Sequence, residues 1–325
     1  MNAISRAFIG PSPPASTRTP DHDAIRSLFV EAQEDFSRWS PDYNMHFGYW
    51  APGMRLFDRE AMLERLNVEV AAQLHLPPAT PVKVIDLGCG AGATARTIAR
   101  LFPRAEVTGV TLVHEQIALG VKLNRRAGLA RRIGFVLSDY TETWTGSGSQ
   151  DAAVAIESFC YAPGHDKLAA VCEASRLLRP GSRLAVVDGF LVHGEPRGLV
   201  GWIYRRWCEC WAVPELARLD AFKAALTRAG FVDIEVRNLF WNIAPSATHV
   251  PVVAFTHMCR ELWKSRGKLS CWRWRHIAAS WLSLLLGLAP WAFRYCLVAA
   301  AALTLWSMVV YLRAAWPDLM RSGSR

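Results

Sequence analysis

The stretch VIDLGCGAG, residues Val84–Gly92, stands between a short apolar run and a segment with helical spacing. The run before it, VKVIDL, is continuously hydrophobic, as expected for a strand buried on both faces of a parallel sheet. Glycines at such a strand-to-helix turn let a ligand approach the backbone, and the following helix offers free N–H groups. The spacing DxGxGxG differs from the GxGxxG of dinucleotide-binding enzymes, and no Lys-Ser or Lys-Thr pair follows, which excludes a phosphate loop.

Strands and helices alternate around this turn. We expect strands at 82–88, 105–112, 133–137, 152–158, 183–190 and, late in the chain, 231–239. We expect helices at 93–101, 115–127, 166–178, 197–211 and 216–229. This alternation predicts an α/β fold with a doubly wound, Rossmann-like sheet.

The sequence divides into four predicted regions. Residues 1–22 are polar and proline-rich and are expected to be disordered. Residues 23–78 form a cap, with helices at 23–36 and 58–76 around the aromatic segment YNMHFGYW at 43–50. Residues 79–245 form the core, and residues 246–325 form a hydrophobic extension.

Composition narrows the choice of partners. The net charge is +9, with Arg and Lys densest between residues 260 and 275, where Trp residues are interleaved. This pattern favours a membrane surface over nucleic acid, for which no binding module is found. The eight cysteines include no paired CxxC of a zinc site, and no metal site is expected. Without an apolar signal segment at the start, a cytoplasmic protein with reduced cysteines is predicted.

The apolar tail at 277–312 has two interpretations. Two apolar stretches joined near Pro290–Arg294 could form a membrane hairpin at the inner face of a membrane. Alternatively, FRYCLVAAA at 293–301 is the last strand of the sheet. Either interpretation suits a lipophilic substrate.

The run DLGCGAG after a first strand resembles motif I of the class I S-adenosylmethionine-dependent methyltransferases. The resemblance extends over roughly residues 24–240. It implies S-adenosylmethionine as cofactor. By the same resemblance, the turn cradles the amino-acid part of that cofactor through Asp86, Gly88, Cys89 and Gly90.

The second strand ends in VTLVHEQ, where most members of this family carry an acidic ribose ligand. Its pattern T-L-x-x-x-Q is similar to the group of cyclopropane fatty acid synthases and sterol, tocopherol and prenyl diphosphate C-methyltransferases. The resemblance implies ribose contacts from Thr111 and Gln116, with Glu115 as an acidic alternative. It also implies an adenine contact from Asp139, with Tyr140 packing beside it.

The fourth strand ends in AIESFCYAPGHDK, Ala155–Lys167, which resembles the Glu-centred run of sterol and tocopherol methyltransferases. A Glu at the carboxyl end of a parallel strand faces the crevice where such sheets bind ligands. Glu157 is therefore a predicted catalytic residue and Tyr161 a predicted substrate contact, although Glu157 could instead be a structural N-cap or bind backbone amides. His165 is a weaker candidate for a base.

In the C-methylating relatives, an aromatic segment with a histidine closes over the active site, and YNMHFGYW is similar in position and content. Aromatic faces stabilise the carbocation that alkene methylation creates, and they exclude water. We therefore expect His46 and Tyr49 to be catalytic and Tyr43, Phe47 and Trp50 to contact substrate. Core packing is the structural alternative for these rings.

Arg205 and Arg206 lie in a second aromatic run, WIYRRWCECW. They could bind a substrate diphosphate, in which case Mg2+ is expected, or they could form the solvated face of a helix.

Three functions compete. The first is C-methylation of an alkene in an isoprenoid or other lipid, with cyclopropanation as a variant. The second is O- or N-methylation of a hydrophobic small molecule. The third is an inactive cofactor-binding module at a membrane. No oligomeric state is predicted.

Overall fold

The computed structural model describes residues 20–264. The prediction of disorder therefore lies almost entirely outside the described residues, and both interpretations of the apolar tail lie wholly outside them. Among the helices of residues 20–264, none is both long enough and apolar enough to cross a bilayer. The membrane surface, the cytoplasmic location and the division at residues 78–79 and 245–246 stay predictions.

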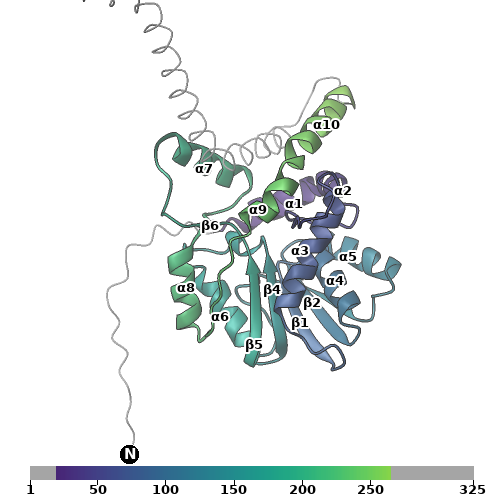
Figure 1. Cartoon of the computed structure of the whole chain (residues 1–325), viewed down its shortest axis with the longest axis vertical. Coiled ribbons are helices and arrows are strands. Elements are labelled where there is room, and N and C mark those ends of the chain that lie inside the picture. The colour runs from purple at the N-terminus through teal and green to yellow at the C-terminus, as the bar shows by residue number, and fades with distance from the viewer. Residues whose placement is uncertain (1–19, 265–325) are drawn as a thin grey trace, which may run out of the picture.

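A five-stranded sheet forms the centre of the molecule, in the order β3-β2-β1-β4-β5 (Figure 1). Its strands are β1 (Val82–Leu87), β2 (Ala105–Thr111), β3 (Ile133–Leu137), β4 (Gln150–Ile156) and β5 (Leu178–Val187). Each neighbouring pair is parallel. The predicted doubly wound α/β fold is confirmed. A separate small sheet pairs β6 (Phe190–Leu191) with β7 (Ala217–Arg218).

The helices are α1 (His22–Glu31), α2 (Gln33–Trp39), α3 (Arg59–Gln73), α4 (Ala93–Leu101), α5 (His114–Arg126), α6 (Leu168–Leu177), α7 (Gly198–Cys210), α8 (Leu219–Arg228), α9 (Phe240–Ala247) and α10 (His249–Lys264). Two begin at an aspartate whose side chain caps the first turn: Asp21 accepts from the Ala24 N–H and Asp58 from the Ala61 N–H. The helix predicted at 23–36 is instead two helices, with Ala32 between α1 and α2.

The strand predicted at 231–239 is wrong. The structure has no strand there, and no strand of residues 20–264 pairs with the segment. Its alternating valines are not buried, since Val232 is 80% and Val236 50% exposed. The period-2 pattern therefore has no sheet face to cover it.

Alternate residues of β1 face two different layers. Val82 and Val84 pack in the cluster formed with α3 and α4, whereas Ile85 and Leu87 pack in the cluster formed with α6 and α8. This burial on both faces explains the continuous hydrophobicity of the strand.

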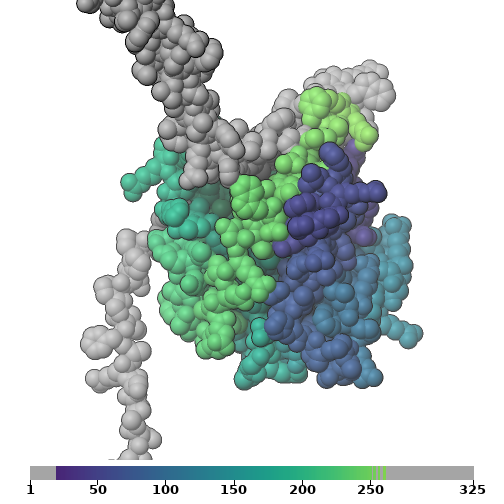
Figure 2. All heavy atoms as spheres, in the orientation of Figure 1, coloured from purple at the N-terminus to yellow at the C-terminus, as the bar shows by residue number. Residues whose placement is uncertain are grey.

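The cap and the end of the described chain form one surface, where α9 and α10 lie beside the N-terminal helices (Figure 2). The Trp50 N–H donates to the Asn242 carbonyl at 2.7 Å, and the Asn242 side chain donates back to the Trp50 carbonyl at 3.0 Å. The Gly48 N–H donates to Ser246 Oγ at 2.8 Å. The aromatic segment is thus held by residues almost 200 positions away.

The sheet order places a switch point between β1 and β4, because the chain winds outward in opposite directions from these two strands. Open α/β sheets bind ligands in the crevice at such a point. The glycine turn follows β1 and Glu157 follows β4.

Candidate active site

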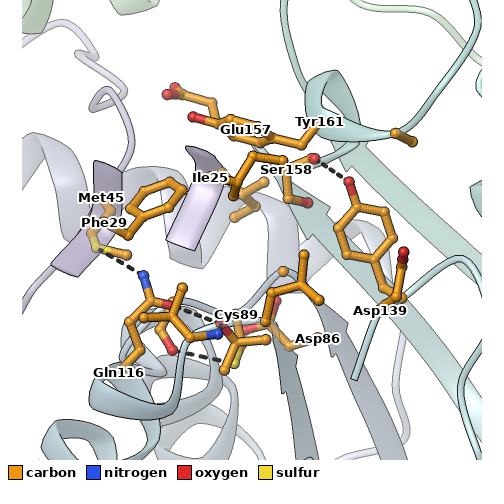
Figure 3. Close-up of a pocket in the computed structure, with 18 of the residues that line it drawn as sticks. Ile25, Phe29, Met45, Asp86, Cys89, Gln116, Asp139, Glu157, Ser158 and Tyr161 are labelled. Carbon is orange, nitrogen blue, oxygen red and sulfur yellow. Dashed lines mark hydrogen bonds between the residues drawn. The ribbon is translucent and has the colours of Figure 1, made fainter. Parts of the chain in front are cut away.

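A cavity of about 910 Å3, its open mouth included, lies at this switch point. Figure 3 shows Glu157 and Tyr161 together at one end, and Asp86, Cys89 and Gln116 at the other. Of the predicted site residues, twelve line it: Tyr43, His46, Asp86, Gly88, Cys89, Gly90, Thr111, Gln116, Asp139, Tyr140, Glu157 and Tyr161.

The glycine turn approaches its neighbours too closely for side chains. Gly88 has a φ of +87°, and a Cβ on it would lie 2.3 Å from the Cβ of Ser158. Gly90 has a φ of +52°, and its Cβ would lie 2.4 Å from Cε of Met45. Both positions therefore favour glycine through backbone conformation, and Gly88 also through space, because the Met45 methyl group near Gly90 is the end of a flexible side chain.

Asp86 ends β1 and is 2% exposed. Its Oδ2 has no hydrogen-bond partner among the described residues. Burial raises the pKa of this carboxyl to about 7. A buried carboxylate without a partner is unfavourable, so Asp86 is suited to a ligand that brings hydrogen-bond donors or positive charge.

The opposite wall is formed at the ends of β2 and β3. Thr111 Oγ donates to Gln116 Oε1 at 2.5 Å. Asp139 Oδ2 lies 3.2 Å from Nε2 of His22 on α1. The Tyr140 hydroxyl donates to the Ser158 carbonyl at 2.6 Å, which ties this wall to the end of β4.

Glu157 stands at the end of β4 with a φ of +48°, a conformation that costs a non-glycine residue energy and is often found at functional sites. Its Oε1 accepts from the Phe47 N–H at 2.8 Å. Burial raises the pKa of Glu157 to about 8; the Phe47 amide lowers it and the Asp188 carboxylate raises it. Glu157 is thus mostly neutral at pH 7, and a cation in the cavity would favour its ionised form.

His46 lines the cavity, but both of its ring nitrogens lie against protein oxygens. Nδ1 is 2.7 Å from the Phe47 carbonyl oxygen and Nε2 is 3.0 Å from Asn67 Oδ1. Neither nitrogen is free to take a proton from a ligand. This arrangement supports Glu157, rather than His46, as the proton acceptor.

Three rings of the aromatic segment do not line the cavity. Phe47 packs edge-on against Trp39 at 6.2 Å, Tyr49 packs against the hydrophobic core, and Trp50 Nε1 donates to the Met54 carbonyl. These contacts favour the structural alternative for the three rings, including the predicted catalytic Tyr49.

Arg205 and Arg206 do not line the cavity either. Both are exposed on α7, and Arg206 pairs with Glu209 at 2.7 Å. Among the described residues, no cluster of three or more His, Cys, Asp or Glu side chains could hold a metal ion.

Phe29 of α1 supplies a cavity ring that the sequence did not single out. It meets Tyr161 edge-on at 5.7 Å, so that the first helix and the loop after β4 touch across the cavity. Ile25, one turn earlier, also lines the cavity. Both residues lie on the apolar stripe of their helix. Apolar spacing in the sequence does not distinguish residues that contact a ligand from residues that pack in the core.

The loop that carries Tyr161 is anchored by Lys167, whose side chain is fully buried. Its Nζ donates to the carbonyls of Cys160, Ala162 and Glu215 at 3.2, 2.7 and 2.7 Å. The neighbouring His165 is also held, with Nε2 at 2.8 Å from Glu215 Oε2. Both residues are therefore engaged in structural contacts.

Replacing Lys167 by methionine is expected to lower the free energy of unfolding by about 2–3 kcal/mol. Three buried carbonyls lose their donor, and the removal of a buried charge offsets part of that cost. Urea titration measures the change. Lys223→Met, at an exposed lysine of α8, is the control and should stay within about 0.5 kcal/mol of wild type. Equal midpoints for the two variants would show that the three hydrogen bonds contribute nothing.

Comparison with known proteins agrees with this geometry. A family model described as a methyltransferase domain matches residues 84–181. The O-methyltransferase cnsE of Penicillium expansum is 32% identical over 227 residues, which are 70% of this chain and 79% of the relative. This chain belongs to the class I S-adenosylmethionine-dependent methyltransferases. The predicted family, enzyme class and cofactor are confirmed.

This methyltransferase is also similar to a plant enzyme in sequence and to a bacterial enzyme in fold. Cycloartenol-C-24-methyltransferase 1 of Oryza sativa subsp. japonica is 36% identical over 180 residues, 55% of this chain and 50% of the relative. The cyclopropane synthase MmaA2 from Mycobacterium tuberculosis shares the fold, with a TM-score of 0.67 and 18% identity over 83% of this chain and 94% of that one.

The cavity residues fit the cofactor. The glycine turn lines the cavity with its backbone, and the unpartnered Oδ2 of Asp86 suits the positively charged part of the cofactor. The methyltransferase would hold it with Asp86, Gly88, Gly90, Thr111, Gln116 and Asp139. S-adenosylmethionine supplies an electrophilic methyl group on a positively charged sulfur. The remaining task of the protein is to orient an acceptor and to accept its proton.

Proposed function

We propose that this methyltransferase methylates an alkene carbon of an isoprenoid or other lipophilic substrate through a carbocation. The supporting observation is Glu157, a buried carboxyl that lines the same cavity as the paired rings of Phe29 and Tyr161. Rings stabilise a developing cation without reacting with it, and a buried carboxyl becomes a better proton acceptor when a cation stands nearby.

In this reaction, the rings and the carboxyl have different roles. Phe29, Tyr43 and Tyr161 enclose the acceptor and keep water from the cation. Glu157, held by the Phe47 amide, takes the proton that restores the alkene.

A diphosphate substrate has less support than an apolar one. Arg206 is paired with Glu209, and neither Arg205 nor Arg206 reaches the cavity. We therefore place an uncharged lipid ahead of a prenyl diphosphate.

O-methylation of a hydrophobic small molecule is the second candidate. It is favoured by the likeness to the Penicillium expansum O-methyltransferase, which covers more of this chain than the likeness to the plant sterol enzyme does. In that reaction, Glu157 would accept a hydroxyl proton instead of a C–H proton.

The test uses purified protein, methyl-labelled S-adenosylmethionine and lipid extracts, with prenyl diphosphates as a parallel set. Label is expected in an apolar, organic-extractable product from the lipid extract, and it should be absent with Asp86→Ala. Transfer only to prenyl diphosphates or to a water-soluble acceptor would contradict the proposed substrate class. Cofactor binding without any transfer would support an inactive module instead.

A further inference from the structure

A chain of buried polar side chains leads from the cavity to the outer end of α3. His46 Nε2 lies 3.0 Å from Asn67 Oδ1, and Asn67 Nδ2 donates to Asn44 Oδ1 at 2.7 Å. Asn44 Nδ2 in turn lies 3.3 Å from Glu60 Oε1. Asn44 and Asn67 are 1% and 0% exposed, so water cannot replace the contacts of Asn67 with His46 and Asn44, whereas Glu60 is half-buried.

The carboxylate of Glu60 fixes the direction of the chain at its outer end. An ionised carboxylate only accepts hydrogen bonds, so the NH2 group of Asn44 must face it. The oxygen of Asn44 then faces Asn67, which must turn its own NH2 group outward. Asn67 Oδ1 therefore faces His46, and Nε2 of the ring has to carry a hydrogen.

The other ring nitrogen of His46, Nδ1, must also carry a hydrogen. Nδ1 lies 2.7 Å from the Phe47 carbonyl oxygen, which also only accepts. With hydrogens on both nitrogens, the ring is a cation while Glu60 is an anion. A neutral ring with its hydrogen on Nδ1 would require both amides to turn over, and the Asn44 oxygen would then need a hydrogen from the Ser40 hydroxyl or from a protonated Glu60.

The surroundings act on these two states in opposite directions, because burial favours the neutral pair and the hydrogen bonds favour the charged pair. Burial lowers the pKa of His46, whereas its hydrogen bonds to Phe47 and Asn67 and the nearby Glu64 raise it. Burial raises the pKa of Glu60, and its hydrogen bonds to Ser40 and Asn44 lower it. The other titratable groups of the cavity are His22, Tyr43, Asp86, Cys89, Asp139, Tyr140, Glu157 and Tyr161.

We propose that Asn67 is a positioning residue that, through Asn44, couples the charge of His46 to that of Glu60 and so sets the charge that the cavity presents to its cofactor. Asn67 also holds a second cavity residue, since its Oδ1 accepts from Thr94 Oγ at 2.8 Å. The inference requires cofactor binding but no particular acceptor, so it is independent of the proposed C-methylation.

The coupling has a consequence for binding. S-adenosylmethionine carries a positive charge on sulfur, and its demethylated product S-adenosylhomocysteine does not. A protonated His46 disfavours the first relative to the second by charge repulsion. The affinity for S-adenosylmethionine relative to S-adenosylhomocysteine is therefore expected to fall as the pH is lowered through the pKa of His46.

The test follows the ring nitrogens of His46 by NMR, with 15N-histidine protein and a pH titration. Asn67→Asp places a carboxylate against Nε2 and should raise the pKa of His46 by about 1 pH unit or more. Glu60→Gln removes the distant anion and should lower that pKa by about half a pH unit. Glu69→Gln, on the same helix but paired with Arg65, is the control and should leave it unchanged.

Opposite shifts in the two variants support the proposal, because loosened packing would move the His46 titration in one direction only. Shifts of the same sign, or a Glu60→Gln titration identical to wild type, would overturn it. Calorimetry adds a second measurement: the pH at which the relative affinity for the two cofactor forms changes should move with the pKa of His46 in each variant. A relative affinity independent of pH would also contradict the proposal.

Discussion

Replacing Glu157 by glutamine is expected to lower kcat by about 100- to 10,000-fold, the usual contribution of a positioned acid or base. Glutamine keeps the shape of the side chain and an oxygen that can accept from the Phe47 N–H. It cannot take up the proton that the methylated acceptor must lose. Steady-state kinetics with the labelled cofactor would measure the change, and the Kd for the cofactor should stay within a few-fold of wild type.

The pH dependence of kcat/KM in the wild-type enzyme should also show that Glu157 acts as a base. Since burial raises the pKa of Glu157 to about 8, kcat/KM should rise with pH through that value as the carboxylate forms. The Glu157→Gln variant should lack this rise.

The thermal stability of the Glu157→Gln variant shows whether the protein is folded and whether Glu157 has the raised pKa. A carboxyl with a raised pKa stabilises the fold fully below its unfolded pKa, near 4.5, and loses that contribution as the pH rises through about 8. Glutamine cannot ionise, so the Tm of the variant relative to wild type should increase between these two pH values. Wild-type turnover in a folded Glu157→Gln protein would exclude Glu157 as the proton acceptor.

Replacing Gly88 by alanine is expected to weaken S-adenosylmethionine binding by about 100-fold or more. A Cβ at this position would lie 2.3 Å from the Cβ of Ser158, so the turn and the end of β4 must separate. The left-handed backbone and the overpacking together cost about 2–5 kcal/mol. Calorimetry gives the Kd, and urea titration gives the change in stability.

Gly128→Ala is a matched control for Gly88→Ala. Gly128 also has a positive φ, +71°, but nothing lies within 4 Å of its Cβ position. This variant should lose about 1–2 kcal/mol of stability and bind the cofactor as wild type does. If Gly88→Ala behaves like Gly128→Ala, the close approach to Ser158 has no role in forming the cofactor site.

The parts of the site that could be predicted are local in sequence. Asp86 lies near the end of a buried strand that Gly88 directly follows, and Glu157 follows another, so strand order alone brings them to one crevice. The orientation of the side chains in the aromatic segment could not be predicted from local sequence. Which of its side chains face the cavity is decided by docking onto Asn242 and Ser246, far along the chain.

Residues whose role depends on contacts with segments far away in the sequence were the hardest to predict. Phe29 and Ile25 form one stripe with core residues, and only the placement of α1 over the cavity makes them ligand contacts. Asn67 reads as a polar position on an otherwise ordinary helix. Its buried contacts with His46 and Thr94 come from three segments that are separate in sequence.

The most direct test of the proposed function identifies the atom that receives the methyl group. The enzyme would be incubated with a lipophilic alkene acceptor and 13C-methyl-labelled S-adenosylmethionine, and the extracted product would be examined by 13C NMR. Alkene methylation predicts one enriched signal at an alkyl shift, coupled to a neighbouring carbon when the acceptor is labelled as well. An enriched methoxy signal would contradict it and establish O-methylation in this cavity.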